Sequence, residues 1–255
     1  MLSIENTNGR RIARVEGGRH DGRYIYLVND MNGDNLYEEI EVKDGILQVL
    51  PNKDVIEKSY VSAPSGAGKS FFTGKWINEY LKQHTRNDFF LFYSISSNKS
   101  LDKNDPIRVE IDAELFDNPI HPSELQDSIV VFDDTDVIAD PIVRNAINGL
   151  RDAVLECGRH YRTSTIITSH ILMNRNETKR IINEATSITF FPNSGSRYSI
   201  KRYLKYHLGL EKNEIVKLLK IKSRWITVYT HAPQYIIHQH GALMMSALGE
   251  DEEKI

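Results

Sequence analysis

The rhythm of hydrophobic and polar positions changes near residue 58. Before it, short alternating apolar runs at residues 12–15 and 24–28 are separated by glycine turns at 17–18 and 22, which predicts a small β-meander. From Tyr60 onward, short continuous apolar runs alternate with helical patterns, as is typical of strands and crossover helices in a central sheet. The predicted strands are residues 60–63, 89–95, 128–132, 165–169 and 187–191.

Helical spacing is clearest after residue 140, where Val143, Ile147, Leu150 and Val154 recur on one face. The pair Asp140-Pro141 predicts the start of this helix and Gly158 predicts its end. Further helices are expected at residues 71–81, 199–208 and 212–219, and a β-hairpin at residues 224–229 and 235–240. The predicted organisation is a small β-rich N-terminal extension at 1–57, an α/β domain at 58–245, and an acidic tail at 246–255 that we expect to be disordered.

Composition narrows the class of protein. A length of 255 residues with 40% hydrophobic residues allows one large core and a modest appendage. Cys157 is the only cysteine, which excludes an internal disulfide and cysteine-based zinc motifs and favours a reducing compartment. The first residues lack the pattern of a signal peptide, and no run approaches the roughly 20 apolar residues of a membrane helix. We therefore expect a soluble protein without a membrane segment.

A phosphate-binding loop is predicted at residues 63–70. The segment reads Ala-Pro-Ser-Gly-Ala-Gly-Lys-Ser, which matches the Walker A pattern except that alanine replaces the first glycine. The glycines let the backbone turn its amides toward phosphates, and the following helix adds the positive end of its dipole. Lys69 is expected to reach the β- and γ-phosphates of ATP, and the Ser70 hydroxyl to bind Mg²⁺. The predicted nucleotide-binding residues are Pro64, Ser65, Gly66, Ala67, Gly68, Lys69, Ser70 and Phe71.

Two carboxylates end the third predicted strand. The apolar residues 129–132 run directly into Asp133 and Asp134, as in a Walker B element. We expect Asp133 to hold Mg²⁺ through a coordinated water, and Asp134 to act as general base toward the attacking water. A buried strand that ends in two aspartates is common by itself, but its combination with the upstream phosphate loop favours the catalytic interpretation.

These motifs together resemble those of the FtsK/HerA superfamily of DNA-pumping ATPases, and specifically the genome-packaging ATPases of large DNA viruses and their virophage relatives. The resemblance extends over residues 60–240 and includes the Asp133-Asp134 pair, the Gly-Arg-His-Tyr-Arg-Thr-Ser-Thr-Ile-Ile-Thr-Ser-His run at 158–170, and Arg-Trp-Ile-Thr-Val at 224–228. It implies a RecA-like P-loop fold that uses ATP and Mg²⁺ to pump double-stranded DNA into a preformed capsid. The implied partners are DNA, further copies of the chain in a ring, commonly six, and a capsid or portal vertex protein. The implied location is a viral factory in the host cytoplasm or the virion.

The resemblance also assigns roles to residues around the fourth core strand. In the superfamily, an arginine just before this strand reaches the nucleotide of the neighbouring subunit, and a polar residue at its end senses the γ-phosphate. Arg159 and His170 occupy these places, with Arg162 as the substitute for Arg159 and with His170 standing where glutamine is common. Two simpler interpretations stay open. Arg159 can stabilise the C-terminal end of its helix by about 0.3–1 kcal/mol, and His170 can be a hydrogen-bonded surface residue.

Charge is unevenly distributed along the chain. The net charge is −3, but residues 175–224 contain twelve Lys or Arg against four Glu, a regional net charge of +8. Cations interleaved with tyrosines on a helix can contact DNA phosphates without regard to base sequence. The predicted DNA-binding residues are Arg197, Lys201, Arg202 and Lys205. The alternative is a solvated helix face whose tyrosines point into the core.

Two other functions remain possible at the level of sequence. The chain can be a different P-loop enzyme, such as a helicase or a nucleotide kinase, or a nucleotide-gated scaffold without catalysis. The presence of Lys69, Ser70, Asp133 and Asp134 argues against the scaffold because the whole hydrolytic set is there.

Overall fold

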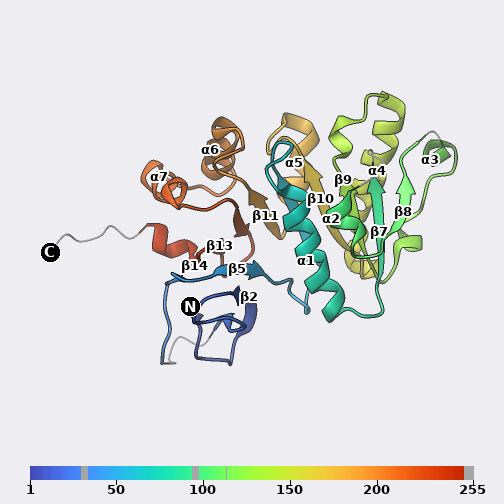
Figure 1. The fold of residues 1–255 in the computed structure, drawn as a ribbon. Helices are drawn as coiled ribbons and strands as arrows, with labels where there is room; N and C mark the ends of the chain where they lie inside the picture. The colour runs from blue at the N-terminus through green and yellow to red at the C-terminus, as the bar shows by residue number, and fades with distance from the viewer. Residues whose placement is uncertain (30–33, 94–97, 113, 250–255) are drawn as a thin grey trace. The chain divides into compact units, whose positions relative to one another are not determined.

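The computed structural model describes residues 1–29, 34–93, 98–112 and 114–249 (Figure 1). The chain divides into two compact units: a central unit, Lys53–Ile188, and a terminal unit made of Met1–Asn52 and Thr189–Ile255. No helix among the described residues combines the length and apolar character needed to span a bilayer.

The central unit is an α/β sandwich around a parallel sheet in the order β6-β10-β9-β7-β8. Two inner strands, β9 and β10, are buried along their whole length, as expected for a sheet covered on both faces. The strands are β6 (Lys58–Ser62), β7 (Asp88–Tyr93), β8 (Ile107–Glu110), β9 (Ser128–Asp133) and β10 (Ser164–Ser169), and β11 (Ser187–Phe190) begins in this unit and ends in the other. The helices are α1 (Lys69–Gln83), α2 (Lys99–Asp102), α3 (Glu114–Asp117), α4 (Pro141–Tyr161) and α5 (Arg175–Glu184), with 3₁₀ turns η1 (Pro122–Leu125) and η2 (Thr135–Val137).

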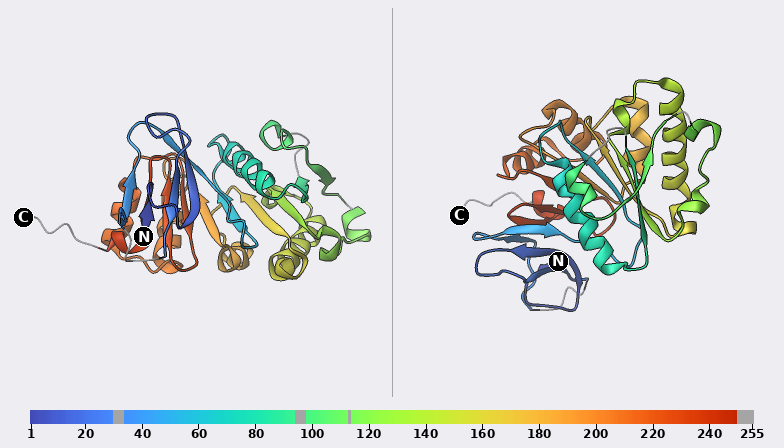
Figure 2. Two further views of the ribbon diagram at one scale, coloured as in Figure 1. Left: turned by 90° about the horizontal axis from the view of Figure 1, so that it is seen from below. Right: turned by 45° about the vertical axis from the view of Figure 1, so that its right-hand side comes forward.

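Helices cover both faces of this sheet. The connection from β6 to β7 and the connection from β9 to β10 run in opposite directions across the sheet, so right-handed crossovers place α1 and α4 on opposite faces. Figure 2 shows α1 on one face and α4 and α5 on the other. The carboxyl ends of β6, β9 and β10 meet at one edge, which is where open α/β sheets bind ligands.

The terminal unit is mainly antiparallel. One sheet has the order β1-β3-β2-β5 and is formed by β1 (Leu2–Ser3), β2 (Arg10–Glu16), β3 (Tyr24–Leu27) and β5 (Ile46–Val49). A second ladder joins β4 (Glu39–Glu41), β14 (Gly241–Met244), β13 (Tyr235–His238) and β12 (Ile226–Tyr229). The remaining elements are α6 (Arg197–Tyr206), α7 (Lys212–Lys220) and the 3₁₀ turn η3 (Met245–Leu248).

The grouping of segments differs from the one predicted at residues 1–57, 58–245 and 246–255. Strand β4 pairs with β14, and the amides of Val42 and Leu47 donate to the carbonyls of His240 and Gln239. These hydrogen bonds join residues 1–52 to the C-terminal part of the chain within one compact unit. Of the predicted acidic tail, residues 246–248 belong to η3, whereas residues 250–255 lie outside the described residues, as do residues 94 and 95 of the second predicted strand.

Two local features of the central unit differ from expectation. Gly158 does not end α4, which continues to Tyr161 with Arg162 in the left-handed conformation at φ 53°. A Cβ on Gly158 would lie 2.8 Å from the carbonyl oxygen of Thr163, so this glycine allows a close backbone approach rather than a helix stop. Strand β8 was absent from the prediction because its side chains are half-buried or exposed at the sheet edge and alternate with charges.

Candidate active site

The phosphate-loop candidate connects β6 to α1 at the edge where the strands end. Gly66 and Gly68 have φ angles of 78° and 105°, a region that side-chain-bearing residues rarely adopt. The amide of Ala63 donates to the carbonyl of Ser169, which ties the start of the loop to β10. Gly68 is the N-cap residue of α1. Because glycine has no side chain, the N-cap residue makes no side-chain hydrogen bond to the amides of the first turn, which face the loop. This geometry suits an anion, since amide hydrogens and the helix dipole converge there.

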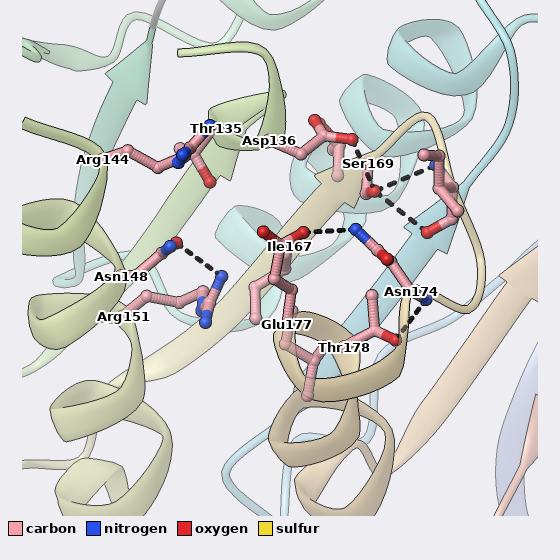
Figure 3. Close-up of a pocket in the computed structure, with 13 residues that line it drawn as sticks. Thr135, Asp136, Arg144, Asn148, Arg151, Ile167, Ser169, Asn174, Glu177 and Thr178 are labelled. Atoms are coloured by element: carbon pink, nitrogen blue, oxygen red, sulfur yellow. Dashed lines mark hydrogen bonds between the residues drawn. The ribbon is translucent and has the colours of Figure 1, made fainter. Parts of the chain in front are cut away.

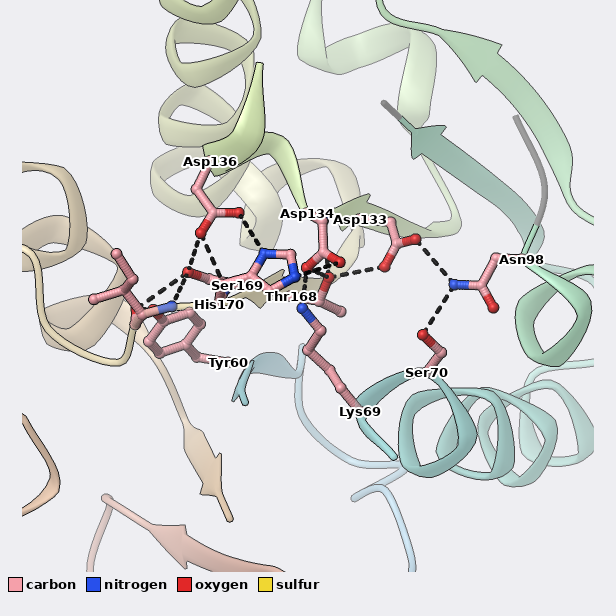
Figure 4. Close-up of polar contacts among 11 residues, drawn as sticks. Tyr60, Lys69, Ser70, Asn98, Asp133, Asp134, Asp136, Thr168, Ser169 and His170 are labelled. Carbon is pink, nitrogen blue, oxygen red and sulfur yellow. Dashed lines mark hydrogen bonds and ion pairs between the residues drawn. The ribbon is translucent and has the colours of Figure 1, made fainter. Parts of the chain in front are cut away.

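Lys69 connects the loop to the acidic end of β9. Its side chain is 5% exposed, and its Nζ forms an ion pair with Asp134 (Figure 4). Asp134 has φ 50°, a left-handed conformation that is uncommon for a non-glycine residue and is often found at functional sites. The two side chains that were predicted to act on the γ-phosphate and on the attacking water are therefore direct neighbours.

Asp133 lies deeper than Asp134 and is 8% exposed. Burial raises the pKa of Asp133, against the opposing effect of the hydrogen bond from Thr168. Thr168 Oγ1 lies 2.8 Å from Asp133 Oδ1 and 3.1 Å from Asp134 Oδ1, and it accepts the amide hydrogen of Asp134 at 2.9 Å. One hydroxyl at the end of β10 thus holds both carboxylates.

A candidate cation site lies between α1 and β9. Asn98 Nδ2 donates to Ser70 Oγ and to Asp133 Oδ2, each at 3.0 Å (Figure 4). Ser70 and Asp133 therefore face the same small space. A hydroxyl and a carboxylate are hard oxygen ligands of the kind that Mg²⁺ takes beside phosphates and water. The residues predicted to bind Mg²⁺ fit that ion in chemistry and in placement.

His170 follows the last residue of β10 and faces two carboxylates. Its Nε2 lies 3.6 Å from Asp134 Oδ2, and its Nδ1 lies 3.7 Å from Asp136 Oδ1. Asp136 Oδ2 also accepts hydrogen bonds from the amide of His170 at 3.0 Å and from Ser169 Oγ at 2.9 Å. These bonds tie the end of β10 to the turn after β9, so the orientation of His170 is linked to the catalytic-base candidate.

Sequence reasoning missed three residues of this cluster: Asn98, Asp136 and Thr168. Each follows or ends a strand whose carboxyl end reaches the same edge. A search for polar residues at the ends of all predicted strands could have found Thr168 and Asp136. Asn98 was harder to identify because it lies five positions after the last residue of β7.

Arg159 and Arg162 do not join the cluster. Helix α4 begins after the carboxyl end of β9 and ends before the amino end of β10, and its 21 residues span about 30 Å. Both arginines therefore lie at the opposite edge of the sheet from the phosphate loop. Arg159 is exposed, whereas Arg162 pairs with Asp127 at 2.6 Å and lowers the pKa of Asp127 through that hydrogen bond. Neither residue can serve the loop of its own chain.

A small pocket adjoins the cluster on the face covered by α4 and α5 (Figure 3). Its volume is about 70 Å³, and Arg151 in its lining is 6% exposed and bonded to Asn148 and Asp152. Pockets for drug-sized ligands typically measure about 300–1,000 Å³. This pocket suits water or a small polar group, so the loop edge stays the candidate for a nucleotide.

The predicted DNA-binding residues lie in the terminal unit, on α6. Arg197, Lys201, Arg202 and Lys205 are all exposed. Tyr198 and Tyr206 are 70% and 69% exposed, and the cations of Arg202 and Lys205 lie 5.6 Å and 5.5 Å from their respective rings. Tyr203 alone of the three points into the core. The outward face of α6 therefore carries four cations and two aromatic rings.

No protein-family model matches the chain. The uncharacterized protein V3 of Sputnik virophage is 35% identical over 246 residues, which make up 95% of this chain and 99% of that protein. The chain belongs to the same family as this virophage protein. Membership in this V3 family bears out the virophage relationship that the motifs implied.

Two solved structures are similar to this V3 family member. The cytoplasmic domain of the type VII secretion ATPase EccC from Thermomonospora curvata matches with a TM-score of 0.52 at 8% identity, over 80% of this chain and 28% of that one. The genome packaging NTPase B204 from Sulfolobus turreted icosahedral virus 2, in complex with AMPPCP, has a TM-score of 0.48 at 14% identity, over 74% of this chain and 98% of that one. The predicted α/β fold of P-loop ATPases is confirmed by the sheet order and the EccC likeness.

Proposed function

We propose that this member of the virophage V3 family is an ATP-hydrolysing motor that pumps double-stranded viral DNA into a preformed capsid as a ring of identical copies. One observation supports the proposal most: Lys69 of the phosphate loop forms an ion pair with Asp134, and Asn98 bridges Ser70 of the loop to Asp133. A phosphate cradle, a cation-binding pair and a base candidate thus share one edge of the sheet.

Each side chain of the site has a separate role in ATP hydrolysis. The loop amides and Lys69 bind the β- and γ-phosphates, and the phosphate draws Lys69 away from Asp134. Ser70 would hold Mg²⁺ directly and Asp133 would hold it through a coordinated water, and the ion would supply positive charge against the phosphates. Asp134, released from Lys69, accepts a proton from the attacking water as its oxygen bonds to the γ-phosphorus. The bond from that phosphorus to the bridging oxygen breaks, and its electron pair leaves with ADP.

His170 lies where it can report the outcome of this step. Its Nε2 approaches Asp134, and Asp136 ties its backbone to the turn after β9. A change at the γ-phosphate that moves Asp134 therefore moves the end of β10. This arrangement supports His170 as the γ-phosphate sensor rather than an isolated surface residue.

Assembly explains why the arginines lie far from the loop. An exposed Arg159 at the opposite edge can reach only a nucleotide bound by a neighbouring copy, where a guanidinium accelerates hydrolysis by roughly 10³–10⁵. Arg162 is less suited because Asp127 already holds it. We infer that Arg159 is the trans-acting residue, so hydrolysis requires a ring.

The decisive assay measures ATP hydrolysis with and without duplex DNA at low salt. DNA should stimulate wild-type protein, and Lys69→Ala and Asp134→Asn should each abolish turnover while thermal unfolding stays cooperative. Mixing Lys69→Ala with Arg159→Ala protomers should restore part of the activity because some interfaces then combine an intact loop with an intact arginine. Hydrolysis that ignores DNA, with no recovery in the mixture, would favour a self-contained P-loop enzyme such as a nucleotide kinase.

The α6 face supplies the proposed contact with DNA. Replacing Lys201 and Lys205 together by alanine should weaken duplex binding and reduce the salt dependence by about one phosphate contact per lysine. The matched control is Lys212→Ala with Lys220→Ala on α7, which removes the same charge from another exposed helix of the same unit. Equal losses in the two pairs would show that only net charge matters, and would remove α6 from the DNA path.

A further inference from the structure

Asn98 is the one described side chain that bonds to both oxygens of the candidate cation site. It immediately precedes α2, and its Nδ2 lies 3.0 Å from Ser70 Oγ and 3.0 Å from Asp133 Oδ2 (Figure 4). The amide joins α1 to β9, two elements that are not neighbours in sequence. Nothing in the loop or acidic-pair motifs calls for an asparagine there.

The position of this amide conflicts with a bound cation. An amide N–H and a metal ion both bind to oxygen lone pairs, and Mg²⁺ needs near-octahedral ligands at about 2.0–2.1 Å. A nitrogen placed between Ser70 Oγ and Asp133 Oδ2 uses the lone pairs that face each other. A cation bound by Ser70 Oγ would use one of those lone pairs, and a metal-bound water that donates to Asp133 Oδ2 would use the other, so the amide and the hydrated cation exclude each other.

We propose that Asn98 is a gate of the magnesium site, whose amide competes with Mg²⁺ for Ser70 and Asp133 and swings away when the Mg²⁺–nucleotide complex binds. The inference rests on the proposed function, because that function assigns the cation to these two residues. In this role Asn98 is a positioning residue: it sets the cation affinity of the site without touching the reacting atoms.

The backbone of Asn98 is connected to the edge of the sheet by a series of contacts. The backbone N–H of Asn98 donates to Asp102 Oδ2 at 3.2 Å, and Asp102 forms an ion pair with Arg108 of the edge strand β8. The Arg108 guanidinium in turn lies 4.1 Å from the centroid of the Tyr93 ring at the end of β7. A chain of contacts therefore runs from the backbone of Asn98 to the edge of the sheet.

If Asn98 had only a structural role, the opposite change in cation affinity would be expected. If the amide only braces Asp133 in a shape that also suits the metal, its removal should weaken cation binding or leave it unchanged. Competition predicts tighter binding because the cation no longer has to displace a donor. The sign of the change in cation affinity thus separates the two roles.

The test is a titration of Mn²⁺, followed by electron paramagnetic resonance, into full-length protein with a non-hydrolysable ATP analogue. Asn98→Ala should bind Mn²⁺ roughly fivefold more tightly than wild type, the equivalent of about one net hydrogen bond. Nucleotide affinity in EDTA should stay the same. The matched control is Asn104→Ala, which removes a similar half-buried amide that donates to Gly74 at 3.1 Å and does not touch the cation-site oxygens. Unchanged or weaker Mn²⁺ binding by Asn98→Ala would overturn the proposal that Asn98 competes with the cation.

A second measurement needs no substitution in the protein under test. The side-chain amide resonance of Asn98, identified by its loss in Asn98→Asp, should shift toward the position of a solvated amide when Mg²⁺ and the analogue are added to wild type. An amide that keeps its hydrogen-bonded shift in the saturated complex also overturns the proposal. Wild-type protein that binds neither nucleotide nor cation would instead defeat the proposed function, so the two failures are distinguishable.

Discussion

Thr168→Val tests whether one hydroxyl organises the acidic cluster. Thr168 is 1% exposed, and its Oγ1 donates toward Asp133 and accepts the amide hydrogen of Asp134. Valine keeps the branched shape of threonine and removes both interactions. The substitution therefore changes hydrogen bonding at the end of β10 with little change in packing.

The expected cost follows from these contacts. A hydrogen bond to a charged group contributes about 1.5–3 kcal/mol, and a buried amide left without an acceptor costs about 1–3 kcal/mol. Because the two losses share one site and are not additive, we expect the free energy of unfolding to fall by roughly 2–4 kcal/mol. For a chain of this size, that corresponds to a decrease in Tm of roughly 5–15 °C. Hydrolysis should fall as well, because both carboxylates lose the same support.

The assay is urea unfolding followed by circular dichroism, with thermal unfolding in parallel. The control is Thr165→Val on the same strand, which is also 1% exposed but whose Oγ1 has no hydrogen-bond partner among the described residues. That control should be neutral or slightly stabilising, since it removes an unsatisfied hydroxyl. If both variants unfold at the same urea concentration, Thr168 does not hold the cluster and the reasoning fails.

Three further predictions address the loop and the terminal unit. Gly68→Ala should weaken nucleotide binding in calorimetry and cost about 1–3 kcal/mol of stability, because φ is 105° there, whereas the exposed helical control Gly149→Ala should be neutral or stabilising. Burial, with a smaller contribution from the nearby His240, lowers the pKa of His238 to about 4, so the unfolded chain takes up a proton at higher pH than the folded one. Stability should therefore fall as pH drops from about 6.5 to about 4, and His238→Gln should remove roughly 3 kcal/mol of that dependence in unfolding titrations; an unchanged pH slope would contradict this. Tyr203→Phe should raise the free energy of unfolding by about 1–2 kcal/mol, because its fully buried hydroxyl has no hydrogen-bond partner among the described residues, and a lower Tm would refute that account.

Local chemistry made the phosphate loop and the acidic pair recognisable. The loop needs glycines at positive φ beside a lysine and a serine, and these residues are contiguous in the chain. The acidic pair follows an apolar run that only a buried strand explains. In both cases neighbouring residues carry the whole signal, so the fold class and the core of the site could be predicted without coordinates.

Contacts between segments that are distant in the sequence could not be predicted from these local patterns. Asn98 meets Ser70 and Asp133 across 28 and 35 residues, and Thr168 reaches Asp133 across 35 residues, because parallel strands bring their carboxyl ends to one edge. The strand order decides which ends become neighbours, and hydrophobic periodicity does not encode that order.

The sequence by itself determined the fully buried strands, the longest helices and the residue types of a phosphate site, since these depend on spacing within short segments. Only the tertiary structure decided that β4 pairs with β14, that Gly158 admits the carbonyl of Thr163, and that Asn98 stands between Ser70 and Asp133. Each of these depends on which backbone and side-chain groups approach each other after the chain has packed. Many pairings satisfy the same pattern of apolar positions, and the close packing of the whole chain selects one of them.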